Sequence, residues 1–413
     1  MSRIRIKNFG PIQDGCLDND GWIEISKTTI FIGNQGSGKS TVAKLISTFT
    51  WIEKALVRGD YDKKWFERKN RLKNQFLNYH RLENYPTQSN GLWGNTEIEY
   101  KGGAYHIKYE KDTLCINEVS KNNYSLPQIM YVPAERNFIA YVKSPKELKL
   151  SSDSLKEFLT EFDNSKREMK GLMQLPINNV NIEYDKLNDI LNIKGEKYKV
   201  KLTDASSGFQ SLVPLYLVSD YLSKSVQKQS ENREKMSTEE ETRFKKGVKD
   251  IWSNDSLTNE QKRLAISVLS SKFNKTSFIN IVEEPEQNLF PTSQWQLLKS
   301  LLELNNINSN NKLIMTTHSP YIINYLSIAI QADYVKKKIK SNNVLMEKLN
   351  AIVPIESTAN SNSVSVYQLN EKTGVIKKLN SYDGIPSDKN FLNESLAESN
   401  NLFDSLLEIE QEL

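Results

Sequence analysis

Hydrophobic positions along the chain follow two periods. Short apolar runs and strict alternation are typical of strands, whereas a spacing of three and four residues is typical of helices. Strands are predicted at residues 3–9, 22–25, 28–32, 96–100, 104–109, 113–116, 129–132, 181–184, 197–201, 278–282, 312–315, 364–369 and 375–379. Helices are predicted at residues 40–56, 141–171, 209–222 and 292–304, and near the C-terminus.

The order of these elements predicts the fold class. Strands and helices alternate along the chain, so we expect an α/β domain with a mixed β-sheet core flanked by helices. Residues 96–116 predict an antiparallel β lobe beside it. Residues 1–413 should form a single unit with helical insertions. Four segments are expected in addition to its core: a basic and aromatic insertion at 57–95, a helical segment at 141–175, a charged helical hairpin at 223–275 and a helical tail at 381–413.

Composition limits the class of protein. Of 413 residues, 38% are hydrophobic and 26% charged, as in globular proteins with a hydrophobic core. The net charge of +4 permits contact with nucleic acid but does not require it. No apolar run is long enough to cross a bilayer, and the first residues lack a signal-peptide layout, so no membrane partner is expected. Cys16 and Cys115 offer no disulfide framework or zinc spacing, and indicate free thiols in a reducing cytoplasm.

A phosphate-binding loop is the clearest motif. Residues 33–40 read Gly-Asn-Gln-Gly-Ser-Gly-Lys-Ser, with a buried strand before them and a helix after them. Inward-pointing N–H groups and the helix dipole would hold phosphate, Lys39 would reach the β- and γ-phosphates, and the Ser40 hydroxyl would ligate Mg²⁺. ATP and Mg²⁺ are therefore the expected cofactors. The nucleotide-binding residues predicted here are Gly33, Asn34, Gln35, Gly36, Ser37, Gly38, Lys39, Ser40 and Thr41.

Two acidic residues follow the strand predicted at 278–282. The strand delivers Glu283 and Glu284 to the edge of the sheet where a phosphate-bound Mg²⁺ would sit. Glu283 would hold Mg²⁺ directly or through water, and Glu284 would polarise the attacking water as general base. The alternative is a pair of solvated acids that cap a strand.

A histidine and a Ser-Gly helix start are the remaining candidate motifs of the nucleotide site. His318, in Thr-Thr-His-Ser-Pro, follows the strand at 312–315 and would bond the γ-phosphate, whereas His80 and His106 are interpreted as structural. Ser207 and Gly208 begin a helix, where N–H groups and the dipole favour an anion, although Ser-Ser-Gly is also an ordinary helix cap. Gln210, in the same segment, is included among the expected nucleotide-binding residues.

The order phosphate loop, Ser-Gly helix start, acid pair and histidine resembles the ABC ATPase superfamily. The similarity is to its SMC-like DNA-repair and overcoming-lysogenization-defect (OLD) branch, and extends over nearly the whole chain, including the opening at residues 3–9. It implies an ATPase in which Ser207 and Gly208 bind the γ-phosphate of a partner subunit. ATP would then hold a homodimer together.

The sequence departs from the family pattern in three places. Glu283 stands where most ABC proteins carry aspartate, although Glu-Glu-Pro-Glu is usual in the OLD-like branch. Phe209 replaces the second glycine of the common signature. The residue of the glutamine loop stays open between Gln128 and Arg136.

The biological role is a separate hypothesis. The chain offers no transporter surface, no long heptad insertion and no acidic nuclease site after His318, so an effector in trans is expected. The compact ATPases of bacterial anti-phage systems of the PARIS and Septu type are similar, and the stretch 131–136 strengthens this likeness. A slow sensor ATPase that controls a toxin or nuclease encoded nearby is the first hypothesis.

Two other hypotheses remain. A DNA-binding repair or recombination ATPase would use the basic and aromatic stretch 63–73, which is otherwise a solvated helix face. A stand-alone nucleotide switch that signals through oligomerisation is the third.

Overall fold

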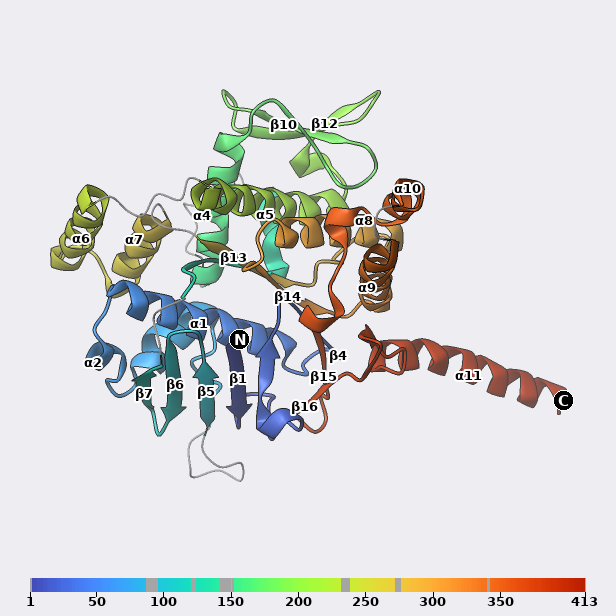
Figure 1. Cartoon of the computed structure of the whole chain (residues 1–413), viewed down its shortest axis with the longest axis horizontal. Helices are drawn as coiled ribbons and strands as arrows, with labels where there is room; N and C mark the ends of the chain where they lie inside the picture. The colour runs from blue at the N-terminus through green and yellow to red at the C-terminus, as the bar shows by residue number, and fades with distance from the viewer. Residues whose placement is uncertain are drawn as a thin grey trace.

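A seven-stranded mixed sheet forms the centre of the computed structural model, which describes residues 2–86, 96–119, 124–141, 150, 152–231, 238–271, 276–339 and 342–412 (Figure 1). In spatial order its strands are β2 (Gly15–Cys16), β16 (Val375–Lys378), β15 (Val364–Leu369), β4 (Thr28–Gly33), β14 (Lys312–Thr317), β13 (Ser277–Glu283) and β8 (Pro127–Val132). The strands from β15 to β8 are parallel, so their carboxyl ends meet at one edge. This confirms the predicted mixed α/β core.

Helix α1 (Lys39–Arg58) lies between this sheet and a second one. The second sheet is antiparallel, in the order β3 (Ile23–Ile25), β1 (Ser2–Lys7), β5 (Glu97–Lys101), β6 (Tyr105–Glu110) and β7 (Thr113–Glu118). Because side chains alternate along a strand, Ile279 and Ile281 of β13 join α1 and the antiparallel lobe in one core. The predicted antiparallel lobe is thus a second layer that also contains β1 (Figure 1).

A buried carboxylate joins α1 to the antiparallel lobe. Glu53 is 1% exposed, and its Oε1 accepts hydrogen bonds from the backbone N–H groups of Ala104 at 2.7 Å and Tyr105 at 3.1 Å. The Tyr100 hydroxyl donates to its Oε2 at 3.0 Å. A Cβ at Gly102 would overlap this carboxylate, so the turn between β5 and β6 requires glycine there.

Helices cover the opposite face of the central sheet. Phe278 and Val282 of β13 point into this second core, which includes side chains of α4 (Asp153–Glu168), α5 (Ser207–Glu231), α8 (Pro291–Asn306) and α9 (Pro320–Ile339). Beyond α5 lies a four-stranded antiparallel sheet (Figure 1). Its order is β12 (Lys199–Lys201), β11 (Ile190–Lys194), β10 (Asn181–Asp185) and β9 (Leu172–Gln174). Helix α10 (Asn343–Ile352) packs on α9.

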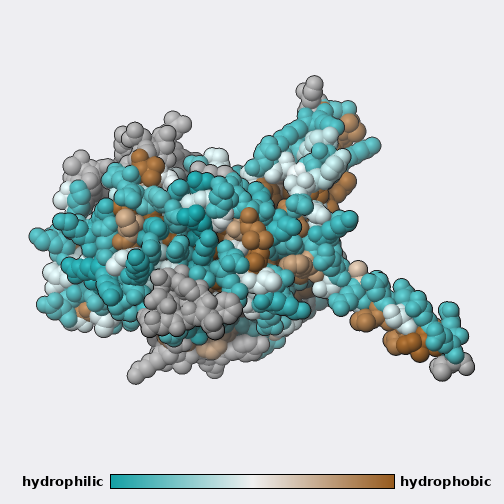
Figure 2. Space-filling view, turned by 90° about the horizontal axis from the view of Figure 1, so that it is seen from below, coloured by the Kyte–Doolittle hydropathy of each residue, from teal (hydrophilic) through white to brown (hydrophobic). Residues whose placement is uncertain are grey.

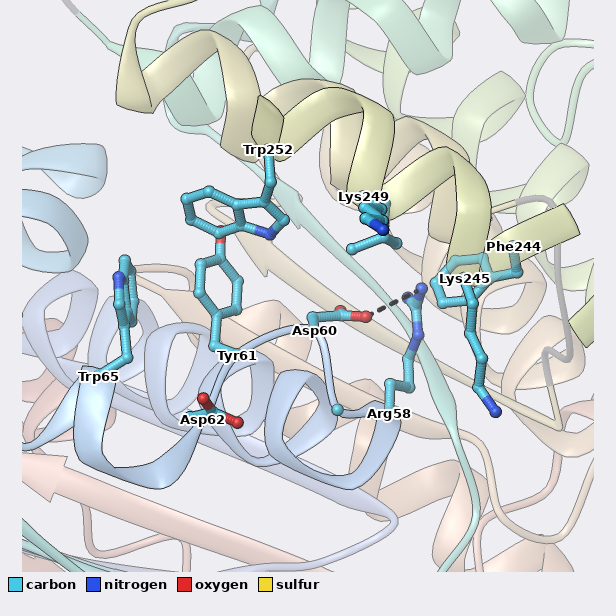
Figure 3. Close-up of a pocket in the computed structure, with 11 residues that line it drawn as sticks. Arg58, Asp60, Tyr61, Asp62, Trp65, Phe244, Lys245, Lys249 and Trp252 are labelled. Carbon is cyan, nitrogen blue, oxygen red and sulfur yellow. Dashed lines mark ion pairs between the residues drawn. The ribbon is translucent and has the colours of Figure 1, made fainter. Parts of the chain in front are cut away.

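The insertions predicted at 57–95 and 223–275 pack on each other. In its described part, residues 59–86, the first contains the short α2 (Lys63–Phe66), a π-helical turn Leu72–Leu77 and a 3₁₀ turn Asn78–His80. The second adds α6 (Thr238–Ser253) and α7 (Asn259–Ser271) beyond the end of α5. Tyr61 contacts Trp252 of α6 edge-on at 5.0 Å and Trp65 at 4.2 Å between ring centroids (Figure 3). Residues 87–95, 232–237 and 272–275 lie outside the described residues.

Several predicted boundaries need correction. The segment 141–175 is not helical throughout, because Leu172–Gln174 forms β9, whose partner is β10; residues 142–149 and 151 lie outside the description. The tail at 381–413 begins with a small hairpin of β17 (Ser381–Tyr382) and β18 (Ile385–Pro386) before α11 (Phe391–Gln411). Strand β2, with only two residues, was too short to be predicted, and β11 was missed although it carries Ile190, Leu191 and Ile193. No helix in the described part of the chain has the length and apolar character of a membrane span.

Candidate functional site

The phosphate loop connects β4 to α1 through backbone that favours glycine. Gly33 ends β4 with φ 149°, and Gly38 precedes α1 with φ 99°, both in the left-handed range. A Cβ at Gly33 would overlap the Leu369 carbonyl of β15. The loop can therefore curl at the amino end of a 20-residue helix, which is the geometry that holds phosphate.

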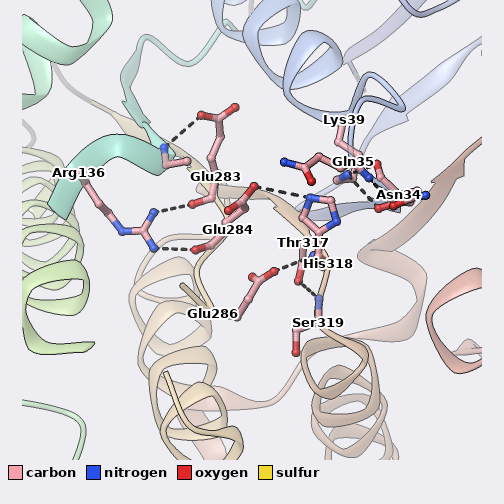
Figure 4. Close-up of polar contacts among 12 residues, drawn as sticks. Asn34, Gln35, Lys39, Arg136, Glu283, Glu284, Glu286, Thr317, His318 and Ser319 are labelled. Atoms are coloured by element: carbon pink, nitrogen blue, oxygen red, sulfur yellow. Dashed lines mark hydrogen bonds and ion pairs between the residues drawn. The ribbon is translucent and has the colours of Figure 1, made fainter. Parts of the chain in front are cut away.

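Lys39 folds back over this loop. Its Nζ donates hydrogen bonds to the carbonyl oxygens of Gly33 at 2.9 Å and Asn34 at 2.8 Å. The side chain is 5% exposed, and desolvation lowers the pKa of Lys39 to about 8, although Glu284 and other nearby carboxylates oppose this shift. The lysine is thus a positive charge without an anionic hydrogen-bond partner at the place where phosphate would bind (Figure 4).

The acid pair stands at the end of β13. Glu283 is 4% exposed, and its Oε2 accepts a hydrogen bond from the Ala134 N–H at 3.2 Å. Glu284 adopts φ 45°, a left-handed conformation that is uncommon for residues other than glycine. Burial, and then the charge of Glu283, raise the pKa of Glu284. The two carboxylates therefore have different surroundings: one is buried and bonded, and the other is half-exposed and turned toward β14.

His318 follows β14 and faces Glu284. Its Nε2 lies 3.6 Å from Glu284 Oε1 (Figure 4). Burial, and then the charge of Lys39, lower the pKa of His318, which keeps the ring neutral near pH 7. The loop that carries it is held by Glu286, whose Oε1 accepts the His318 backbone N–H at 2.7 Å. The phosphate loop, acid pair and histidine therefore converge on one edge of the sheet.

Arg136 performs a structural role that the sequence did not reveal. It lies in the 3₁₀ turn Ala134–Asn137 after β8 and is fully buried. Its guanidinium donates to the carbonyl oxygens of Glu283 at 2.7 Å and Glu284 at 2.6 Å (Figure 4). Its Nε donates to the Ser211 carbonyl at 3.0 Å. Gln128, the other glutamine-loop candidate, lies at the opposite end of β8 beside Phe278.

The Ser-Gly helix start lies beside the loop that follows the acid pair. Ser207 is exposed at the first turn of α5. A Cβ at Gly208 would lie 2.8 Å from the Asn288 carbonyl oxygen, so this contact favours glycine. Gln210 is turned inward instead, because its Nε2 donates to the Thr203 carbonyl at 3.0 Å and the side chain is 3% exposed. Only Ser207 and Gly208 of this group are placed to contact another molecule.

The residues fit Mg-ATP. Among the described side chains, the buried Ser37 hydroxyl has no hydrogen-bond partner, as expected for a loop shaped to receive phosphate oxygens. Ser40, at the second position of α1, and Glu283 supply the oxygen donors that Mg²⁺ prefers. Within the described ranges no group of three His, Cys, Asp or Glu side chains forms a metal site by itself, so Mg²⁺ would depend on the phosphates for its other ligands.

Residues 137–323 match the family model of the AAA ATPase domain. The match spans less than half of the 413 residues; it contains the Ser-Gly helix start, the acid pair and His318, and begins after the phosphate loop. The matched segment is similar to an ATPase domain without including the loop at 33–40. No curated protein matches the chain in a sequence comparison.

Solved structures with a similar arrangement include SMC heads and an ABC cassette. The SMC head domain from Thermotoga maritima shares 11% identity with a TM-score of 0.35, covering 92% of this chain and 98% of that one. An Smc head bound to the C-terminal domain of ScpA, from Pyrococcus furiosus, shares 10% identity with a TM-score of 0.36, covering 98% and 100%. A dimeric bacterial ABC transporter cassette shares 11% identity with a TM-score of 0.25, covering 92% and 100%. At such TM-scores, fold and function rest on the geometry of this chain.

Proposed function

We propose that the chain binds Mg-ATP at residues 33–41 and hydrolyses it to ADP and phosphate. The observation that carries the proposal is the convergence of Lys39, Glu284 and His318 at the carboxyl edge of the parallel strands, with Glu284 Oε1 3.6 Å from His318 Nε2. Glu284, with its raised pKa, is the group that accepts a proton from water as the general base. Lys39 leaves the carbonyls of Gly33 and Asn34 to contact the phosphates.

The other residues position this reaction. Ser40 and Glu283 would hold Mg²⁺, which neutralises the charge that develops on the phosphates when it is bound. His318, kept neutral by its surroundings, would donate a hydrogen bond to the γ-phosphate and lose it after cleavage. Arg136 fixes the backbone of both glutamates, so the carboxylates keep their positions through the cycle.

The active form is proposed to be a dimer in which ATP is enclosed between two copies. Its support is that Ser207 is exposed at a helix N-terminus, while the side chains that surround Lys39 are Glu283, Glu284 and His318 of the same chain. Ser207 would thus act on the nucleotide of the partner copy. Each site would be incomplete in a single chain.

Mixing two inactive variants tests this arrangement. Ser207→Arg blocks the Ser-Gly helix start and Lys39→Ala disables the phosphate loop, so each protein alone should not hydrolyse ATP. An equal mixture should recover roughly a quarter of wild-type activity, because half of the dimers are mixed and each has one complete site. A mixture that stays inactive while both proteins still dimerise contradicts a role for Ser207 in trans. If Ser207→Arg alone keeps wild-type activity, the site is complete within one chain.

The proposed biological role is that of a slow sensor and scaffold ATPase in a bacterial anti-phage system, acting in the cytoplasm on a separate toxin or nuclease. The likeness of the 131–136 stretch and of the compact head to PARIS and Septu ATPases supports it. The mass of Glu284→Gln, with and without Mg-ATP and with the adjacent gene's product, tests the role. An ATP-dependent assembly that carries the second protein is expected. A protein that ignores both contradicts the role and leaves the ATPase proposal intact.

DNA binding is the second candidate because four basic residues of the 57–95 insertion are accessible. Lys63, Lys64, Arg68 and Lys69 are exposed, whereas Trp65 packs on Tyr61 instead of standing free to stack on a base. Replacing all four with alanine should reduce the salt dependence of DNA binding if they contact phosphates. The matched control removes four lysines around the four-stranded sheet, at 186, 194, 197 and 201. A stand-alone switch would instead oligomerise with ATP and need neither partner.

A further inference from the structure

Helix α11 leaves the body of the molecule with its apolar side chains in solvent. It has 21 residues, so it extends about 30 Å, and Figure 1 shows it projecting from the edge of the fold near β15 and β16. None of its residues is buried, and all positions from 394 to 412 are exposed. The exposed apolar side chains are Leu396, Leu402, Phe403, Leu406, Leu407 and Ile409.

These apolar side chains share one face of the helix. At 100° per residue they occupy an arc of about 160°, the width of a helix face that normally contacts a core. They are between 39% and 63% exposed, and Figure 2 shows apolar surface along the projecting helix. Contiguous apolar surface of this kind marks a contact with another molecule. A helix with such a face gains stability only when the face is covered.

The base of α11 is firmly attached, so its direction is set by the fold. The buried Asn390 side chain caps the helix by accepting the N–H groups of Leu392 at 3.1 Å and Asn393 at 3.2 Å. Its amide donates to the Ser387 carbonyl at 3.0 Å. Leu392 packs against the helical core, and α11 contacts β4, the strand that leads into the phosphate loop. A protein on α11 would thus be held at a fixed place relative to the nucleotide site.

The charges on α11 select the kind of partner. The residues from 390 to 413 include no lysine, arginine or histidine. The acidic residues of the helix are Glu394, Glu398, Asp404, Glu408, Glu410 and Glu412. All but Glu410 lie on the face opposite the apolar arc or along its border. Two copies of α11 placed together would face each other with like charges only, which disfavours pairing of α11 with itself and binding to an anionic membrane.

We propose that α11 is the docking helix for a different protein, whose surface offers an apolar groove or helix bordered by lysine and arginine side chains. The identification of this protein with the separate effector rests on the proposed function, but the docking chemistry does not. The apolar face supplies the contact area, and the acidic border sets the orientation and the choice of partner.

A synthetic helix tests this chemistry on the full-length protein without nucleotide, so the result does not depend on ATP hydrolysis. The probe is a labelled 28-residue amphipathic peptide with leucine at its core positions and lysine at the flanking ones. Its control peptide carries glutamate in place of lysine. Fluorescence anisotropy should show saturable binding of the lysine peptide that weakens as salt rises, and at least tenfold weaker binding of the glutamate peptide.

Paired double variants locate the binding. Leu402→Glu with Leu406→Glu places two charges on the apolar face, whereas Asn401→Glu with Ser405→Glu places the same two charges on the polar face. The first pair should weaken peptide binding at least tenfold, and the second should leave it unchanged or slightly stronger. Circular dichroism checks that both keep their helix content.

Three results overturn the proposal. Equal binding of both double variants places the peptide elsewhere. A dimer seen by sedimentation without nucleotide, and lost in the Leu402/Leu406 variant, makes a second copy the occupant. Binding to neutral phosphatidylcholine vesicles that depends on the same two leucines makes a membrane the occupant.

Discussion

The imidazole Nε2 of His318 lies 3.6 Å from Oε1 of Glu284, although 34 positions of sequence separate the two residues. Adjacent parallel strands bring them together, because β13 and β14 end side by side with Glu283 opposite Thr316. The histidine, neutral near pH 7, accompanies a half-buried carboxylate whose pKa is raised. The pair therefore combines a proton acceptor with a hydrogen-bond donor at the point where a γ-phosphate would be cleaved.

Glu284→Gln should stop hydrolysis while ATP still binds. The amide keeps the size of the side chain but cannot accept a proton from water, so kcat should fall by about 10² to 10⁴-fold. Phosphate release and nucleotide binding, measured on the same protein, check this. The control is Glu371→Gln, which removes a carboxylate that accepts the Asn34 amide at 3.2 Å outside the acid pair. Equal turnover of wild type and Glu284→Gln would mean that another group is the base.

The apparent affinity for ATP should fall between pH 7 and pH 9. The pKa of Lys39 without nucleotide is about 8 because burial disfavours its charge. The protonated form binds phosphate, so its population falls through this window, and affinity should decrease by roughly tenfold at pH 9. Titration calorimetry at several pH values gives the profile. Lys39→Arg stays charged throughout, so any affinity that it retains should be flat over the same range.

Arg136→Lys should destabilise the fold and slow the reaction together. Lysine keeps the charge but cannot serve the carbonyls of Glu283, Glu284 and Ser211 at once. Leaving buried carbonyls unpaired should cost about 1–3 kcal/mol each. Thermal unfolding and kcat report the two effects. Arg81→Lys is the control, since Arg81 makes an exposed ion pair with Glu135 nearby. An unchanged melting temperature and kcat in Arg136→Lys would contradict the role assigned to the guanidinium.

Two adjacent glycines offer a matched test of the turn between β5 and β6. Gly102→Ala places a methyl group on the Glu53 carboxylate, and overpacking of a buried site typically costs about 1–3 kcal/mol. Gly103→Ala meets only the Tyr124 ring edge at 3.2 Å, so the loss should be smaller. Urea denaturation compares the two free energies of unfolding. Equal losses would show that Glu53 moves aside without cost.

The parts of the site that could be predicted from the sequence are those formed by a short continuous segment of the chain. The strand–loop–helix junction at 33–40 and the strand ends at Glu283 and His318 each show their chemistry within about ten residues, and the structure brings them to one edge. The trans role of Ser207 and the Mg²⁺ role of Ser40 remain predictions. The position of the Gln210 side chain could not be predicted from the local sequence, because it points inward to donate a hydrogen bond to the preceding 3₁₀ turn Leu202–Asp204.

Long-range contacts could not be predicted from local patterns. The pairing of β1 with β5 joins residues 90 to 98 positions apart, and nothing in either segment specifies the other. Arg136 was a candidate for the glutamine loop, yet its guanidinium bonds backbone carbonyls at the end of β13 and in α5, which carry no sequence signal. The tail was predicted as a helix, but whether its apolar face is covered depends on contacts that only the fold shows.

The Glu53 carboxylate has a mechanical consequence for the reaction cycle. It ties the C-terminal half of α1 to the turn between β5 and β6 through two backbone hydrogen bonds to a buried carboxylate. Because α1 begins at Lys39, a shift of this helix on nucleotide binding would be passed through the Glu53 carboxylate to the antiparallel lobe.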